Sequence, residues 1–97
     1  MKRLQKKNYY DYSYLSNPNS VYVGRPTKWG NPFKEKDYGL KICLEKYHIW
    51  LIEQLKENPK FLDPLKGKDL VCFCKLNRPC HADIIIEFLN EEVEKLI

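Results

Sequence analysis

The order of apolar segments is the feature that most constrains the fold of this chain. A short β-branched and aromatic run, SVYVG at residues 20–24, ends in glycine and predicts a buried strand. A second run, DLVCFC at residues 69–74, lies beyond a segment with helical periodicity at residues 37–57. Two strands separated by a helix of this length predict a parallel pair with a right-handed crossover. We therefore expect a small α/β domain with a parallel βαβ core and helices packed on the sheet.

The two helical segments are recognised by their apolar spacing and by their ends. Pro59 ends the first helix, and a single short turn is expected at residues 60–66. A second helix is expected at residues 79–96, where Pro79 suits the first turn. The apolar residues of the first helix recur at steps of three and four: Leu40, Leu44, Tyr47, Leu51 and Leu55. The second helix carries three consecutive isoleucines, 84–86, and a homodimer would bury their surplus apolar surface.

The N-terminal segment differs in charge from the rest of the chain. The net charge of +4 comes from four cations in the first eight residues, Lys2, Arg3, Lys6 and Lys7, because basic and acidic residues balance elsewhere. Residues 1–19 are therefore interpreted as a basic, tyrosine-rich arm, and residues 20–97 as a single α/β domain. The arm is either a solvated terminus or a weak phosphate-binding segment, and it could add an edge strand.

Membrane and secreted classes do not fit the composition. No stretch approaches the roughly 20 apolar residues of a membrane span, and the basic N-terminus has no apolar core behind it. We expect an intracellular, cytoplasmic protein, in the host cytoplasm if its origin is viral. Its four cysteines are then expected to stay reduced. Cys43 lies beside the apolar stripe of the first helix and is expected in the protein core.

The parallel arrangement predicts that two unusual loops meet. GRPTKWGNPF, residues 24–33, follows the first strand, and CKLNRPCH, residues 74–81, follows the second. Ligands of open α/β sheets bind beyond the carboxyl ends of the strands, so the two loops are expected to form one pocket. Neither loop contains a P-loop or a dinucleotide-binding fingerprint, so neither of these two motifs is assigned to the pocket.

The first loop has the residue types of a nucleotide-binding pocket. Arg25 can clamp a phosphate, Lys28 adds charge, and Trp29 offers a flat face for stacking. Gly30 admits close approach of the backbone, and Asn31 can read the edge of a base or ribose. These residues predict binding of a nucleotide, a nucleotide derivative or a nucleic-acid end. The alternative is that the aromatic residues cover the core while Arg25 and Asn31 hold the loop together.

Three interpretations of the second loop stay open. In the first, Cys72, Cys74, Cys80 and His81 bind Zn²⁺, although the C-x-C-x5-C-H spacing differs from the usual zinc knuckles. In the second, Cys74, Cys80 and His81 line a ligand pocket and one of them is catalytic, with Asp83 orienting His81 or capping the helix. In the third, the cysteines are small core residues and the histidine is satisfied locally.

The paired segments VYVGRPTKWGNPF and GKDLVCFCKLNRPCHADIII resemble a small uncharacterised family of bacterial and viral proteins, a domain of unknown function. That family has G-R-x-x-[KR]-W-G-N-P-[FY], then G-x-x-L-x-C-x-C, then P-C-H-[AG]-D. The resemblance covers about residues 21–89 and is compatible with a viral origin, but it implies no established activity. It implies these motif positions: Gly24, Arg25, Lys28, Trp29, Gly30, Asn31, Pro32, Cys72, Cys74, Cys80, His81 and Asp83.

The end of the motif also resembles a second uncharacterised family, in which a strand cysteine is followed by Cys-His-Arg at a helix start. This chain has Ala82 where that family has arginine, so no residue role is transferred from it.

The leading hypothesis is a small protein that binds a phosphorylated ligand or a nucleic-acid end between the two loops. Arg25 and the helix N-terminus would hold phosphate, His81 would be a general acid or base, and Cys74 or Cys80 a nucleophile. A hydrolase or glycosyl-transfer enzyme is one form of this hypothesis, and whether the protein is an enzyme stays open. The alternatives are a non-catalytic, zinc-stabilised interaction module and a viral protein that binds DNA or a host protein.

Overall fold

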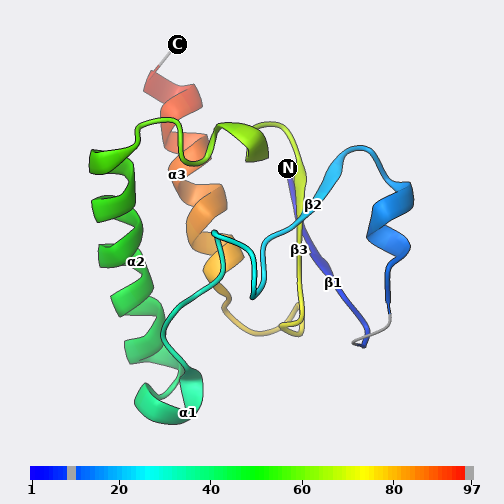
Figure 1. Cartoon of the computed structure of the whole chain (residues 1–97), viewed down its shortest axis with the longest axis horizontal. Coiled ribbons are helices and arrows are strands. Elements are labelled where there is room, and N and C mark those ends of the chain that lie inside the picture. The colour runs from blue at the N-terminus through cyan, green and yellow to red at the C-terminus, as the bar shows by residue number, and fades with distance from the viewer. Residues whose placement is uncertain (9–10, 96–97) are drawn as a thin grey trace.

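The computed structural model describes residues 1–8 and 11–95 of the chain. The longer helices lie together on one side of the strands (Figure 1). The elements follow in the order β1 (Arg3–Gln5), a 3-10 turn (Ser13–Ser16), β2 (Ser20–Tyr22), α1 (Glu35–Tyr38), α2 (Leu40–Glu57), a second 3-10 turn (Asp63–Leu65), β3 (Asp69–Cys72) and α3 (His81–Lys95).

The three strands form one parallel sheet in the order β1-β3-β2, with β3 in the centre. Leu70 pairs with Arg3 on one side and with Val21 on the other. The helix α2 lies between β2 and β3 in the chain, so these elements form the parallel βαβ unit that the sequence predicts. The small α/β fold is confirmed. The two strands that the sequence predicts, β2 and β3, each end two residues earlier than expected, since the pairing stops at Tyr22 and at Cys72.

The basic N-terminal segment takes part in the sheet through β1. The guanidinium of Arg3 forms an ion pair with Asp83, Nη1 to Oδ2 3.0 Å, and Nη2 donates to the Lys75 carbonyl oxygen at 2.8 Å. The Lys6 side chain is buried, with Nζ between 4.7 and 5.5 Å from the ring centroids of Tyr12, Tyr14, Tyr22 and Phe73. An edge strand inside residues 1–19 is therefore present, and two of the four cations of this segment, Arg3 and Lys6, are held within the fold, while Lys2 and Lys7 are exposed.

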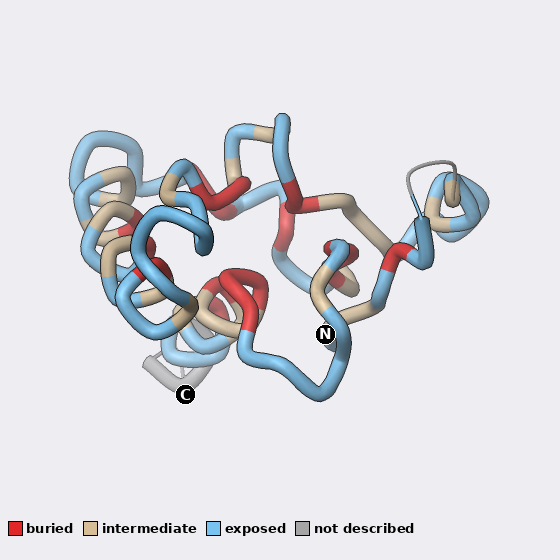
Figure 2. The backbone as a smooth tube through the Cα atoms, turned by 90° about the horizontal axis from the view of Figure 1, so that it is seen from below, coloured by how far each residue is buried: buried red, intermediate tan, exposed pale blue. Residues whose placement is uncertain are grey.

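The core lies between the sheet and the pair α2–α3 (Figure 2). The fully buried side chains include Tyr47 and Leu51 from α2, Leu70 from β3, and Ile85 and Leu89 from α3. This set matches the apolar faces that the helical spacing predicts. Within the described residues, none of the helices combines the length and apolarity that a membrane crossing requires.

The helix expected at residues 37–57 is divided in two. Gly39 has a φ of 77°, which ends α1, and its N–H donates to the Glu35 carbonyl oxygen at 2.7 Å before α2 begins. The helix α3 begins at His81 rather than at residue 79. Of its three isoleucines, Ile85 is fully buried and the other two pack partly against the same core, so a homodimer stays a prediction.

Candidate functional site

A pocket of about 190 Å³ lies where the loops after β2 and β3 meet, at the carboxyl ends of those strands. The first loop contributes Arg25 and Asn31, and the start of α1 contributes Glu35. The end of β3 contributes Cys72, the second loop contributes Cys74 and Cys80, and α3 contributes His81. The two loops therefore converge as the parallel topology predicts.

The pocket takes in only some of the predicted site residues. Its lining includes Arg25, Asn31, Cys72, Cys74, Cys80 and His81. Four other candidates do not line it: Lys28, Trp29, Gly30 and Asp83. The first loop is therefore divided between residues that face the pocket and residues that face the core.

Trp29 packs on the core instead of offering a stacking surface in the pocket. Its indole Nε1–H donates to the Phe61 carbonyl oxygen at 2.9 Å, and its own carbonyl oxygen accepts from the Tyr47 hydroxyl at 2.7 Å. The Lys28 ammonium lies beside the same aromatic group, 5.0 Å from the Trp29 ring centroid and 5.7 Å from that of Phe61. A buried indole needs a partner for its N–H, and here a backbone carbonyl supplies it. The ligand-binding roles expected for Trp29 and Lys28 do not fit this placement.

Asn31 and Gly30 hold the first loop in shape. The Asn31 side chain is buried; its Nδ2 donates to Cys43 Sγ at 3.0 Å, and its Oδ1 accepts from the Phe33 N–H at 2.9 Å. A Cβ at Gly30 would lie 2.9 Å from the Arg25 backbone nitrogen, so only glycine fits there without displacement. Asn31 reaches the pocket wall, but both ends of its amide are already used by the protein.

Arg25 is the cation of the first loop that faces the pocket. Its backbone carbonyl oxygen accepts from the Tyr22 hydroxyl at 3.1 Å, which anchors the residue, while its side chain is exposed. Its charge helps to lower the pKa of His81, a shift caused mainly by burial. The ion pairs found among residues 1–8 and 11–95 do not include the Arg25 guanidinium.

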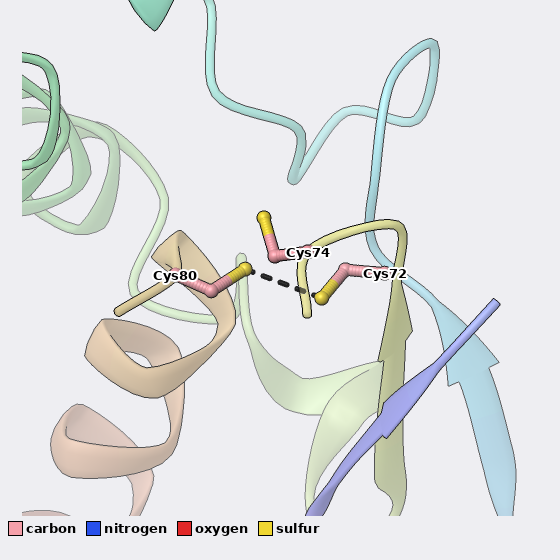
Figure 3. Close-up of side chains that lie close together, drawn as sticks. All are labelled: Cys72, Cys74 and Cys80. Carbon is pink, nitrogen blue, oxygen red and sulfur yellow. Dashed lines mark hydrogen bonds between the residues drawn. The ribbon is translucent and has the colours of Figure 1, made fainter. Parts of the chain in front are cut away.

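Three cysteine side chains that line the pocket lie close together (Figure 3). Cys72 ends β3, Cys74 lies two residues later in the turn, and Cys80 directly precedes α3. The Sγ atoms of Cys72 and Cys80 are 3.2 Å apart, and all three Sγ atoms lie within 4.8 Å of one another. Cys72 and Cys80 are each 1% exposed, whereas Cys74 is half-buried. This is a cysteine cluster that could bind a metal ion.

The three clustered thiols differ in their pKa. The pKa of Cys74 is lowered to about 2, first because the Cys72 thiol, and then the Cys80 thiol, donates a hydrogen bond to its thiolate. The pKa of Cys72 is raised to about 11, mainly by the hydrogen bond that it donates to Cys74. The pKa of Cys80 is raised as well, by its hydrogen bonds with Cys72 and Cys74. These hydrogen bonds favour the thiolate form at Cys74 over that at Cys72 or Cys80.

His81 is held by the backbone of the first loop. Its Nε2 lies 2.9 Å from the Val23 carbonyl oxygen, and its Nδ1 lies 3.5 Å from Cys80 Sγ. A carbonyl oxygen only accepts, so Nε2 carries the proton in the neutral ring. Burial lowers the pKa of His81, which keeps the ring neutral at physiological pH.

Asp83 caps the helix, which is one of the two roles predicted for it. Its Oδ2 accepts from the Cys80 N–H at 3.0 Å, and the Asp83 N–H donates to the Cys80 carbonyl oxygen at 3.0 Å. The same Oδ2 lies 3.0 Å from Arg3 Nη1. The catalytic role considered for Asp83 does not fit, since its carboxylate is engaged by Arg3 and by the helix start, outside the pocket.

Comparison with known proteins places the chain in a family. A family model described as "Domain of unknown function (DUF4326)" matches residues 5–91. The chain belongs to this family. The matched range contains both loops and all three clustered cysteines. No curated protein and no solved structure matches the chain. Its function therefore has to be argued from the geometry of the site.

Sequence reasoning missed two charged groups at this site. Glu35 lines the pocket and forms an ion pair with Arg78, Oε1 to Nη2 2.6 Å, which joins the start of α1 to the second loop. Arg3 holds the second loop through Lys75, and its charge helps to lower the pKa of Cys74. Glu35 gave no signal in the sequence, because it lies in a polar stretch. Arg3 could have been found only by aligning the first strand beside β3.

Proposed function

We propose that this pocket binds a small phosphorylated ligand, namely the phosphate end of a nucleotide derivative or of a nucleic acid. The observation that carries the proposal is the placement of Arg25. Its exposed side chain lines a pocket at the carboxyl ends of two parallel strands, where open α/β sheets bind ligands. Guanidinium groups bind phosphate through paired N–H donors.

The charges around the pocket favour Arg25 over the other arginines. Arg3 is paired with Asp83, and Arg78 is paired with Glu35. The N-terminus of α3, expected to hold phosphate, already has the Asp83 carboxylate on the Cys80 N–H. Arg25 is the arginine at this site that has no ion pair within the described residues, so its donors are available to an anion.

The size of the pocket limits which part of a ligand enters it. At about 190 Å³ it is smaller than the roughly 300–1,000 Å³ of pockets that enclose drug-sized molecules. A phosphate or a phosphorylated sugar fits this volume, while a whole nucleotide does not. Since Trp29 faces the core, a base would lie outside the pocket, and recognition would centre on the phosphate.

The proposal is one of binding. His81 Nε2 is bonded to the Val23 carbonyl oxygen, and Asp83 is engaged by Arg3 and Cys80. The acid–base roles expected of these two residues in a hydrolase or glycosyl-transfer enzyme are therefore not supported by their contacts.

The test compares two cations of one loop. Binding of ribose 5-phosphate, AMP and inorganic phosphate is measured by calorimetry, with adenosine as the ligand that lacks phosphate. Loss of a charged hydrogen bond costs about 1.5–3 kcal/mol, so Arg25→Ala should weaken binding of the phosphate ligands about 10- to 100-fold. Lys28→Ala removes the same charge from the same loop and should leave affinity unchanged. Equal effects of the two substitutions, or no binding of any phosphate probe, would contradict the proposal.

A further inference from the structure

The cysteine cluster has contacts that distinguish it from an ordinary buried thiol. Cys43 is buried too, but its Sγ donates to the Phe33 carbonyl oxygen at 3.0 Å and accepts from Asn31 Nδ2 at 3.0 Å. The contacts described for Sγ of Cys72 and Cys80 are to other cysteines and to the His81 ring. Cys43 is tied into the loop by backbone and amide groups, whereas the clustered thiols face one another.

We infer that Cys72, Cys74 and Cys80 form a zinc centre that holds Zn²⁺ through three thiolates, with its fourth position facing the pocket. The spacing of the sulfurs supports this directly. Zn–S bonds of about 2.3 Å in a tetrahedron separate two ligand sulfurs by about 3.8 Å. The Cys72 and Cys80 sulfurs are 3.2 Å apart and all three lie within 4.8 Å, so shifts of less than about 1 Å between sulfurs complete the set.

The surroundings of the cluster suit thiolate ligands. Arg3 donates to the carbonyl oxygen of Lys75, the residue after Cys74, at 2.8 Å, and its guanidinium is mostly buried. Its positive charge therefore lies beside the cluster and offsets the net negative charge that three thiolates leave on a divalent ion.

His81 supports the centre and does not complete the set. The three cysteine sulfurs all lie within 4.8 Å of one another. Among the described residues, no histidine nitrogen lies within that distance of all three. The ring is held through Nε2 on the Val23 carbonyl oxygen, and its Nδ1 lies 3.5 Å from Cys80 Sγ. The vacant fourth position is then directed to the pocket that the cysteines line, as in zinc sites that bind a water or a ligand.

Metal entry has a defined proton balance. Zn²⁺ and three thiolates give a complex with one net negative charge, and each cysteine that enters as a thiol releases one proton to the buffer. No electron is transferred, so neither an oxidant nor a reductant takes part. The inference depends on the cysteines alone and does not require the phosphate ligand proposed above.

The experiment measures zinc binding by the full-length, reduced protein. Chelator-treated protein is titrated with ZnCl₂ against a chromophoric chelator, and bound zinc is counted by elemental analysis. We expect one Zn²⁺ per chain for the wild type and for Cys43→Ser, which changes a buried thiol outside the cluster. Cys72→Ser, Cys74→Ser and Cys80→Ser should each weaken binding by more than about 100-fold, beyond the loss that removing a supporting group causes.

Two variants keep the test independent of folding. Cys74 is half-buried, so Cys74→Ser is the cluster substitution expected to keep its native circular dichroism spectrum while losing zinc. His81→Gln retains an N–H donor for the Val23 carbonyl oxygen but removes Nδ1, and it should keep one zinc per chain. Absence of zinc in reduced wild type, or unchanged affinity in folded Cys74→Ser, would overturn the inference. Loss of zinc in folded His81→Gln would overturn the three-cysteine ligand set.

Discussion

The loops after β2 and β3 are both rich in unusual side chains, but the fold uses them differently. In the first loop, Trp29 donates to the Phe61 carbonyl oxygen and Asn31 bonds Cys43, so most of its polar groups are partnered within the protein. At the second loop and the end of β3, the sulfurs of Cys72, Cys74 and Cys80 lie within 4.8 Å of one another in the lining of the pocket. An enrichment of functional residue types therefore does not distinguish a loop that shapes a site from one that supplies its chemistry.

The two loops are held in place by different groups. The first loop is held from within, since its own indole and amide bind the core. The second is held from outside, by Arg3 on the Lys75 carbonyl oxygen and by Glu35 on Arg78. A loop supported by other elements can leave its own side chains available for a ligand or a metal.

The largest effect is expected at Trp29. Trp29→Ala removes a half-buried indole and the bond to Phe61, and it should lower the free energy of unfolding by about 3 kcal/mol. Trp29→Phe keeps most of the apolar area and should cost about 1 kcal/mol, the net value of one hydrogen bond. Urea denaturation followed by circular dichroism measures both.

Cys74 supplies the matching substitution in the second loop. Cys74→Ala in metal-free protein should change the free energy of unfolding by less than about 1 kcal/mol, because a half-buried thiol contributes little packing. If Cys74→Ala lowered the free energy of unfolding as much as Trp29→Ala does, or if Trp29→Ala left it unchanged, the two loops would not differ in how their side chains contribute to stability.

The sequence predicts the topology of this protein better than the roles of its side chains. Helical periodicity and chain order were enough for the parallel βαβ unit, and topology then placed both loops at one pocket. The role of Trp29 depends on whether the Phe61 carbonyl oxygen comes within reach of the indole, which residue type does not encode. The cysteines were recognisable because C-x-C at a strand end and a third cysteine before a helix meet in any such fold. The role of Arg3 could not be recognised in the sequence, because a strand of three residues is too short to show an alternating pattern.

A smaller effect is expected at Asn31, where the first loop is tied to α2. Asn31→Ala removes the donor to Cys43 and the acceptor of the Phe33 N–H, and it should cost about 2 kcal/mol, since buried groups lose their partners. A double-mutant cycle with Cys43→Ala should give a coupling of about 1 kcal/mol. Additive effects of the two substitutions would show that this contact does not hold the loop, and that Asn31 is available to a ligand.

The smallest effect is expected at Lys28, which separates charge from packing within the first loop. Its ammonium lies over the rings of Trp29 and Phe61 on the exposed side of the molecule, where a cation–π contact contributes about 0.5 kcal/mol.

Lys28→Ala should therefore lower the free energy of unfolding by about 0.5 kcal/mol, and the exposed Lys34→Ala serves as the control for a general change of charge. The same urea denaturation, repeated at high salt, checks whether the difference between the two variants diminishes as the charge is screened. If Lys28→Ala lowered the free energy of unfolding as much as Trp29→Phe does, the lysine would be one of the residues that hold the first loop in shape. The lining of the pocket would not change, because its residues from the first loop are Gly24, Arg25, Asn31 and Phe33.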